Sequence, residues 1–363
     1  MDGKIAVFGG TFNPPHIGHV EICEKLLAAK QYGIEKIIIM PCGNPPHKTA
    51  LTGVRHRMNM CRLAFDMPKV EISGYEADKP DISYTYLTLE HIKKEYGAKP
   101  YYIAGGDSMR DMRFWKEPRR VAENCEIIAV GRTYTSGAEQ AAAEFKKEFG
   151  AAVRFSDIAV PDVSSTEIRI LNSCGLDIQK LTGAAVAGYI KGNNICNEYK
   201  SYADILRPLM KEERFVHSVY TAVTAHKLAA RYGLDGGKAV IAGLVHDCAK
   251  EIPEADIKNK YGVKIPSEIA AMHRKVRHAP LGALLAPKLF GIADPDILDA
   301  IKYHTSGNDN MKPLTKLIFI ADYIEPTRGY DDTIEMYNLA FRDIDEAVKA
   351  KYAEIDRKLK NEG

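Results

Sequence analysis

The chain has few of the sequence features that mark membrane, secreted or nucleic-acid-binding proteins. Its 363 residues contain no apolar run near the roughly 18 residues needed to span a bilayer, and no signal peptide is expected at its start. The net charge of +2 gives no general attraction to nucleic acids or membranes. The seven cysteines are scattered without a CxxC pair. This excludes a disulfide framework or a zinc finger and favours a cytoplasmic location.

What the chain does contain is a change of pattern near residue 190. Before it, short apolar runs alternate with amphipathic stretches, which predicts an α/β fold with a doubly wound, mostly parallel sheet. The expected strands are 5–8, 36–40, 70–72, 101–104, 127–130 and 153–155.

After the change no strand pattern remains, and an all-α domain is expected. Its helices are predicted at 202–232, 237–250, 253–261, 266–276, 282–290, 294–304, 314–324 and 334–360. The polar stretch 191–199 is interpreted as a linker between a first domain at 1–195 and a second at 200–363.

The segment from Gly9 to His19 reads GGTFNPPHIGH. A glycine turn between an expected strand and a helix lets backbone amides approach a phosphate, and the helix N-terminus adds partial positive charge. His16 and His19 are three residues apart, so one helical turn can present both to the same ligand. Both can donate to phosphate oxygens as charge spreads in a transition state. The segment therefore predicts a nucleotide phosphate site at the carboxyl edge of the sheet.

Further segments follow in order: PPHK, RHRMNM, SYTYLTL, GGDSMRDMRFW and VSSTEIR, which begin at residues 45, 55, 83, 105 and 163. Together with GGTFNPPHIGH they resemble the (H/T)xGH nucleotidyltransferases, and specifically the nicotinate-nucleotide adenylyltransferases, over most of residues 3–190. The resemblance implies a Rossmann-like fold. It also implies transfer of AMP from ATP to nicotinate mononucleotide, giving deamido-NAD and pyrophosphate, with Mg²⁺ accompanying ATP. Asn13 departs from the family pattern, in which many relatives carry Asp.

The resemblance also assigns roles. His16 and His19 are expected to act on the ATP phosphates as catalytic residues, and Trp115 to stack on the nicotinate ring. The expected ATP- and substrate-binding residues are Gly9, Gly10, Thr11, Phe12, Lys48, Thr85, Gly106, Asp107, Trp115, Ser164, Ser165, Thr166 and Arg169. Adenylyl transfer to a related acceptor, such as nicotinamide mononucleotide or phosphopantetheine, is the alternative.

The second half carries a different set of residues. His246 and Asp247 end an apolar run, and Asp322 lies inside the apolar segment LIFIADYIEP, where an unpaired carboxylate would be costly. Histidines and aspartates on separate helices offer nitrogen and oxygen ligands, as iron or manganese prefers. This half offers more such histidine and aspartate ligands than one tetrahedral zinc site uses, which favours a two-metal centre. Sequence spacing alone does not group them.

The segments RFVHS, GLVHDCAK, RHAPLGA, KYHTSG and ADYIEPTR resemble the ordered motifs of HD-domain phosphohydrolases. The closest group splits diadenosine tetraphosphate symmetrically into two ADP, and the resemblance covers residues 200–345. It implies an iron centre, with manganese as the alternative metal, held by His217, His246, Asp247, His278, His304 and Asp322.

Lys250, one helical turn after His246, and Arg328 are expected to act in catalysis by holding phosphate oxygens. Two alternatives stay open for this half: hydrolysis of another nucleotide or cyclic phosphodiester, and a nucleotide-sensing module that regulates its neighbour. The chain is thus expected to be a bifunctional cytoplasmic enzyme that acts on ATP, nicotinate mononucleotide and diadenosine tetraphosphate. Neither nucleic acid nor membrane is expected as a partner, and homo-oligomers are left open.

Overall fold

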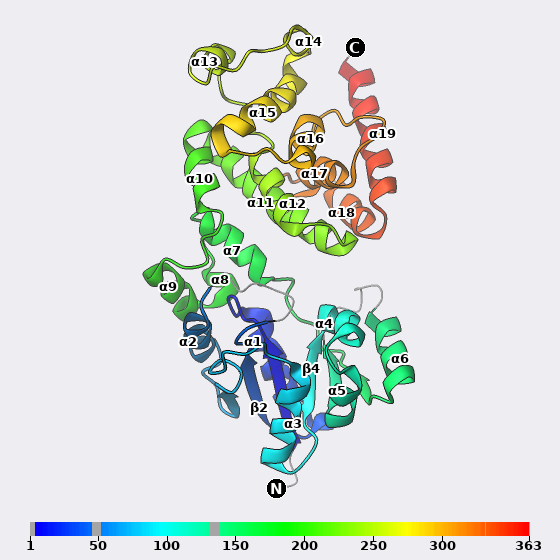
Figure 1. Ribbon diagram of the computed structural model, residues 1–363. Coiled ribbons are helices and arrows are strands. Elements are labelled where there is room, and N and C mark those ends of the chain that lie inside the picture. Colours follow the sequence, from blue (N-terminus) through cyan, green and yellow to red (C-terminus); the bar gives the residue numbers. More distant parts are fainter. Residues whose placement is uncertain (1–3, 46–51, 131–137, 331, 363) are drawn as a thin grey trace. The chain divides into compact units, whose positions relative to one another are not determined.

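The computed structural model describes residues 4–45, 52–130, 138–330 and 332–362. The chain divides into two compact units, one of 1–172 with 176–196 and the other of 173–175 with 197–363. Among the described residues, all strands belong to the first unit, and the second unit is helical (Figure 1). The expected fold class, an α/β domain followed by an all-α domain, is confirmed.

The sheet of the first unit is parallel throughout and has the strand order β3-β2-β1-β4-β5-β6. The direction of winding reverses between β1 and β4, which is where doubly wound sheets bind ligands. Each expected strand is present: β1 Lys4–Gly10, β2 Ile34–Pro41, β3 Val70–Ile72, β4 Tyr101–Gly105, β5 Glu126–Val130 and β6 Val153–Phe155.

Helices cover both faces of this sheet, which explains why its strands are apolar without alternation. Val7 of β1 packs with Leu89 on one face, whereas its neighbour Ala6 packs with Leu26 on the other. The longer helices of the unit are α1 Ile17–Ala28, α2 Val54–Ala64, α3 Thr85–Tyr96, α6 Ala138–Phe149, α7 Ser165–Ser173 and α9 Ala184–Asn193. Because α9 continues to Asn193, the first residues of the expected linker are helical.

The second unit is a bundle of helices. Its longer members are α11 Glu212–Tyr232, α12 Gly236–Val245, α15 Arg274–Phe290, α16 Pro295–Tyr303, α17 Pro313–Ile324, α18 Thr333–Arg342 and α19 Ile344–Glu362. Helices α11 and α12 approach closely, because a Cβ at Gly243 would lie 2.6 Å from the Ala222 Cα. Only glycine allows this approach. No helix in the described part of the chain has the length and apolar character that a membrane crossing requires.

Several predicted helix boundaries were wrong. The single helix expected over 202–232 is two, α10 Lys200–Leu206 and α11, separated by a short 3₁₀ turn that contains Pro208. The stretch 334–360 divides into α18 and α19 near Asp343, whose backbone is extended. Conversely, α15 runs as one helix through Pro280 and Pro287, where two segments were expected.

Candidate active sites

The first candidate site lies where β1 ends and α1 begins. The backbone N–H of His16 donates to Nδ1 of His19 at 3.2 Å, and the two rings stack with centroids 3.6 Å apart. Gly18 makes room for this arrangement, since a Cβ there would lie 3.1 Å from Nδ1 of His16. The HxGH spacing therefore places both imidazoles together at a helix N-terminus, as predicted.

Burial keeps both imidazoles neutral near pH 7. It lowers the pKa of His16 to about 4, and it lowers the pKa of His19 well below its usual value, with His16 adding to the effect. Nδ1 of His16 is buried and has no hydrogen-bond partner among the described residues. An unsatisfied buried polar atom is costly, so this atom is a natural contact for a ligand. The pair can therefore act as neutral hydrogen-bond donors rather than as fixed cations.

The serine-rich motif of α7 meets the same loop. The Ser165 hydroxyl donates to the backbone oxygen of Pro14 at 2.7 Å, and Nη1 of Arg169 donates to that of Asn13 at 2.9 Å. Nη2 of Arg169 also donates to the Thr166 hydroxyl at 3.1 Å. Two predicted phosphate-binding motifs from opposite ends of the unit thus lie side by side, which their sequence separation could not show.

The two residues expected to meet the nicotinate ring share a neighbour. Trp115 contacts the ring of Tyr102 edge to face, with centroids 6.0 Å apart, and the Thr85 side chain hydrogen-bonds Tyr102. Tyr102 lies against the glycine turn, because a Cβ at Gly9 would lie 3.2 Å from its hydroxyl oxygen. Thr85 and Trp115 are therefore linked through one buried tyrosine to the phosphate loop.

The remaining residues that were expected to bind ATP or substrate have no side-chain hydrogen bond or ring contact with the histidine pair or lie outside the described residues, except Phe12, whose ring packs against His19. The ring of Phe12 is 2% exposed and packs edge-on against His19 and Phe65, so only its backbone is available to a ligand. The Ser164 hydroxyl accepts from the Glu167 N–H at 3.1 Å at the start of α7. Gly10 is the last residue of β1 and Thr11 follows it, while Gly106 begins the short helix α4 Gly106–Asp111. Lys48 and the side chain of Asp107 lie outside the described part of the structure.

Arg57 on α2 is a residue whose role the sequence did not reveal. It is 1% exposed, and its guanidinium donates to four backbone oxygens. These belong to Thr11 at 2.8 Å, Cys42 at 2.6 Å, Gly43 at 3.0 Å and Thr52 at 3.0 Å. Arg57 therefore connects, through hydrogen bonds, the loop that follows β1 and the loop that follows β2. The segment RHRMNM indicated a family motif here, but the sequence did not show which atoms Arg57 contacts.

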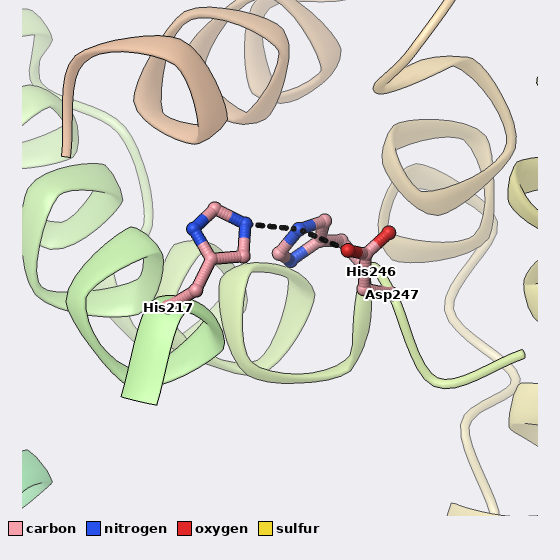
Figure 2. A group of neighbouring side chains, drawn as sticks. All are labelled: His217, His246 and Asp247. Atoms are coloured by element: carbon pink, nitrogen blue, oxygen red, sulfur yellow. Dashed lines mark hydrogen bonds and ion pairs between the residues drawn. The ribbon is translucent and has the colours of Figure 1, made fainter. Parts of the chain in front are cut away.

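The second candidate site lies inside the helical unit. His217 is on α11, His278 on α15 and Asp322 on α17, whereas His246 with Asp247 and His304 directly follow α12 and α16. Figure 2 shows three of these side chains pointing toward one another. Nε2 of His217 lies 3.3 Å from Nε2 of His246 and 3.0 Å from Oδ1 of Asp322, which in turn lies 3.5 Å from Nε2 of His246.

Asp247 connects this group to a second one. Its Oδ1 lies 3.2 Å from Nε2 of His278 and 3.3 Å from Nε2 of His304, and these two nitrogens are 3.2 Å apart. Its Oδ2 lies 3.8 Å from Nε2 of His246. The two groups, His217–His246–Asp247 and Asp247–His278–His304, each have a spacing that could hold a metal ion. The six residues that the resemblance grouped are therefore brought together.

The hydrogen bonds around the rings favour a cation at the centre. Nδ1 of His246 contacts the Gly243 oxygen at 2.7 Å, and Nδ1 of His304 contacts the Ile301 oxygen at 2.8 Å. A carbonyl only accepts, so each neutral ring carries its proton on Nδ1 and turns the lone pair of Nε2 inward. Burial lowers the pKa of His304, which favours the neutral form. Lone pairs that face carboxylate oxygens repel, and a metal ion would relieve this. The donor set, without thiolate, fits iron, manganese or a similar ion.

Both aspartates stay ionised in this cluster. Burial alone would raise their pKa values, but the neighbouring histidines hold the pKa of Asp247 and of Asp322 well below the usual range. Lys351 of α19 adds to this for Asp322: its buried ammonium donates to the Phe319 oxygen and lies 3.9 Å from Oδ2 of Asp322. Lys351 was not predicted, since it comes from a helix beyond the motifs.

Cations line the outer side of the cluster. Nζ of Lys250 lies 3.3 Å from Oδ2 of Asp247, and the Arg328 guanidinium contacts Asp322. Lys250 was expected one turn along a helix from His246, which is wrong because α12 ends at Val245 and Lys250 lies in the turn that follows. Arg214, which was not predicted, lies 2.7 Å from Oδ2 of Asp247. The side chains of Arg214, Lys250 and Arg328 are 26%, 31% and 26% exposed, so each can also reach a ligand.

Comparison with known proteins defines the class of each half. Residues 7–170 match the cytidylyltransferase-like family model, and residues 214–327 match the HD domain model. These assignments agree with the doubly wound sheet and with the histidine–aspartate cluster.

Individual relatives show more closely which family each half belongs to. A probable nicotinate-nucleotide adenylyltransferase of Clostridium tetani is 38% identical over 52% of this chain and 96% of its own length. The symmetrical bis(5'-nucleosyl)-tetraphosphatase of Bacillus subtilis is 41% identical over 38% of this chain and 75% of its own length. A probable nicotinate-nucleotide adenylyltransferase/Ap4A hydrolase of Mycoplasma pneumoniae is 25% identical over 97% of this chain and 95% of its own length. The chain therefore belongs to the nicotinate-nucleotide adenylyltransferases in its first half and to the HD-domain symmetrical tetraphosphatases in its second, which confirms the resemblance.

Proposed function

We propose that the chain is a bifunctional enzyme of nucleotide metabolism. Its first half transfers AMP from ATP to nicotinate mononucleotide, and its second half hydrolyses diadenosine tetraphosphate to two ADP. The observation that carries this proposal is the joint presence of both sites on one chain, as in the Mycoplasma pneumoniae relative that carries both names.

In the first reaction a phosphate oxygen of nicotinate mononucleotide attacks the α-phosphorus of ATP, and pyrophosphate leaves. No covalent intermediate is needed, so the protein positions the reactants and stabilises charge. His16 and His19 would donate hydrogen bonds to phosphate oxygens from the N-terminus of α1. Arg169 and the hydroxyls of Ser165 and Thr166 would hold the β- and γ-phosphates, with Mg²⁺ carried by the nucleotide.

Acceptor preference tests this assignment. Pyrophosphate release would be measured with nicotinate mononucleotide, nicotinamide mononucleotide and phosphopantetheine under identical conditions. The proposal requires the highest kcat/KM with nicotinate mononucleotide. Preference for another acceptor would support the alternative of a related adenylyltransferase.

In the second reaction water adds to the polyphosphate bridge and two ADP molecules leave. A bound divalent metal pair would supply Lewis-acid polarisation of the phosphate and a low-pKa water. The six-residue cluster would hold these ions, with Asp247 shared between them. Arg214, Lys250 and Arg328 would bind and orient the phosphate oxygens, since arginine forks suit phosphate. Iron is the proposed metal and manganese the alternative.

The double variant His246→Ala, Asp247→Ala tests the metal assignment. It removes the shared ligand and its neighbour, and diadenosine tetraphosphate cleavage should fall to background. Retained cleavage would disprove the assignment. The nucleotide-sensing alternative predicts a different result. Wild type and the double variant would then both bind diadenosine tetraphosphate, and neither would release ADP.

A further inference from the structure

The imidazoles of the cluster differ in the hydrogen-bond partner of Nδ1, the ring nitrogen that points away from the other ligands. His246 and His304 each contact a backbone carbonyl through Nδ1. His217 instead contacts a carboxylate, with its Nδ1 2.9 Å from Oε1 of Glu325. Glu325 follows α17 directly and is fully buried. A buried carboxylate is costly unless it is fully hydrogen-bonded, so the environment of Glu325 needs an explanation.

The carboxylate of Glu325 is held rigidly. The Thr327 N–H donates to Oε2 at 2.7 Å, and the Thr327 hydroxyl donates to Oε1 at 2.6 Å. An ionised carboxylate only accepts, so the His217 ring must place its proton on Nδ1. Nε2 faces Asp322 and His246, and when the ring is neutral the lone pair of Nε2 points in the direction that a metal ligand requires.

Among the described residues, a carboxylate behind an imidazole is found on one side of the cluster. We define the first half-site as His217, His246, Asp247 and Asp322, and the second as Asp247, His278 and His304. The first half-site offers one more ligand, and one of its imidazoles is hydrogen-bonded to an anion, which raises the basicity of a ligating nitrogen.

We propose that Glu325 is a positioning residue, an inference that rests on the metal centre of the proposed function. It holds His217 in the ligating orientation and makes the first half-site the tighter of the two. The two ions then load in sequence, the first half-site before the second.

Titration of the metal-free full chain with Mn²⁺ tests this inference, with free Mn²⁺ followed by electron paramagnetic resonance. Wild type should show a tighter and a weaker class of site. His278→Ala should remove only the weaker class, which assigns it to the second half-site. Glu325→Gln keeps the shape but removes the charge, and it should weaken the tighter class by about 10–100-fold. Glu335→Gln, at an exposed position of α18, is the matched control and should behave as wild type.

Thermal unfolding of the metal-free variants separates positioning from a merely structural role. The inference requires the melting temperature of metal-free Glu325→Gln to stay near that of wild type while the shift produced by Mn²⁺ becomes smaller. Thr327→Val removes one donor to Glu325 and should weaken the same class by a smaller factor, which gives a second test if Glu325→Gln does not fold. An unchanged tighter class, or an equal weakening of both classes, would overturn the inference. Absence of Mn²⁺ binding by wild type would instead overturn the metal centre itself.

Discussion

At the scale of single residues, the same side-chain type is suited to two kinds of ligand. His16 and His19 are stacked, buried and low in pKa, so they offer neutral N–H groups to an anion. In the second half, His246 and His304 have their Nδ1 protons fixed by carbonyls, and their Nε2 atoms, which face the other ligands of the cluster, suit a cation. The hydrogen-bond partner of each ring, rather than the residue type, decides which ligand it can bind.

The low pKa of His16 predicts a pH-dependent stability. In the unfolded chain His16 binds a proton near pH 6.5, but in the folded chain only near pH 4. Its contribution to stability is therefore full above pH 6.5 and is lost as the pH falls toward 4. Between pH 7 and pH 5 wild type should lose about 2 kcal/mol that His16→Gln does not lose.

Urea unfolding at the two pH values measures this difference. Trp115 is the only tryptophan of the chain and lies in the first unit, so its fluorescence reports that unit. Equal pH dependence in wild type and His16→Gln would show that His16 titrates normally in the folded protein.

At the scale of elements, the strands were predictable and several helix ends were not. The apolar runs that form β1 to β6 are local signals, and each was found within a few residues. The division of 202–232 at Pro208 and the continuity of α15 through Pro280 depend on packing, which a local pattern does not contain.

The same distinction applies to the sites. GGTFNPPHIGH is contiguous, so the glycine turn, the helix start and the histidine pair could be inferred from spacing. The histidine–aspartate cluster draws its residues from five helices or their ends, and only the family motifs grouped these residues. Arg57, Glu325 and Lys351 were missed because their partners are backbone or side-chain atoms distant in sequence.

Arg57 gives a prediction about how elements are held together. Arg57→Met would leave four backbone oxygens without their donor, so the first unit should lose at least about 3 kcal/mol of unfolding free energy. Arg55→Met, two residues earlier and exposed, is the control and should change it by less than about 0.5 kcal/mol. Similar urea midpoints for the two variants, followed by Trp115 fluorescence, would refute the structural role of Arg57.

At the scale of the whole molecule, the two sites are built from separate sets of elements. Every residue of the first site belongs to the unit with the sheet, and every residue of the metal cluster belongs to the helical unit. Separate cores and separate donor sets require no coupling between the two reactions. The domain limits at 1–195 and 200–363 and the cytoplasmic location are predictions, and homo-oligomers are left open.

Selective inactivation of the full chain tests this independence. His16→Ala should lower adenylyl transfer by about 100-fold or more, as expected for loss of a transition-state donor. Diadenosine tetraphosphate cleavage by the same variant should stay within about twofold of wild type. The double variant His246→Ala, Asp247→Ala should show the reverse. Loss of both activities in either variant would indicate obligatory coupling.

The most direct test of the account is a single preparation of wild-type protein, analysed for metal content and for the products of diadenosine tetraphosphate. The structure predicts two transition-metal ions per chain, since Asp247 is shared by two ligand groups. The proposed function further predicts ADP as the sole nucleotide product. A protein that cleaves the substrate without bound transition metal, or that releases AMP and ATP, would contradict the account.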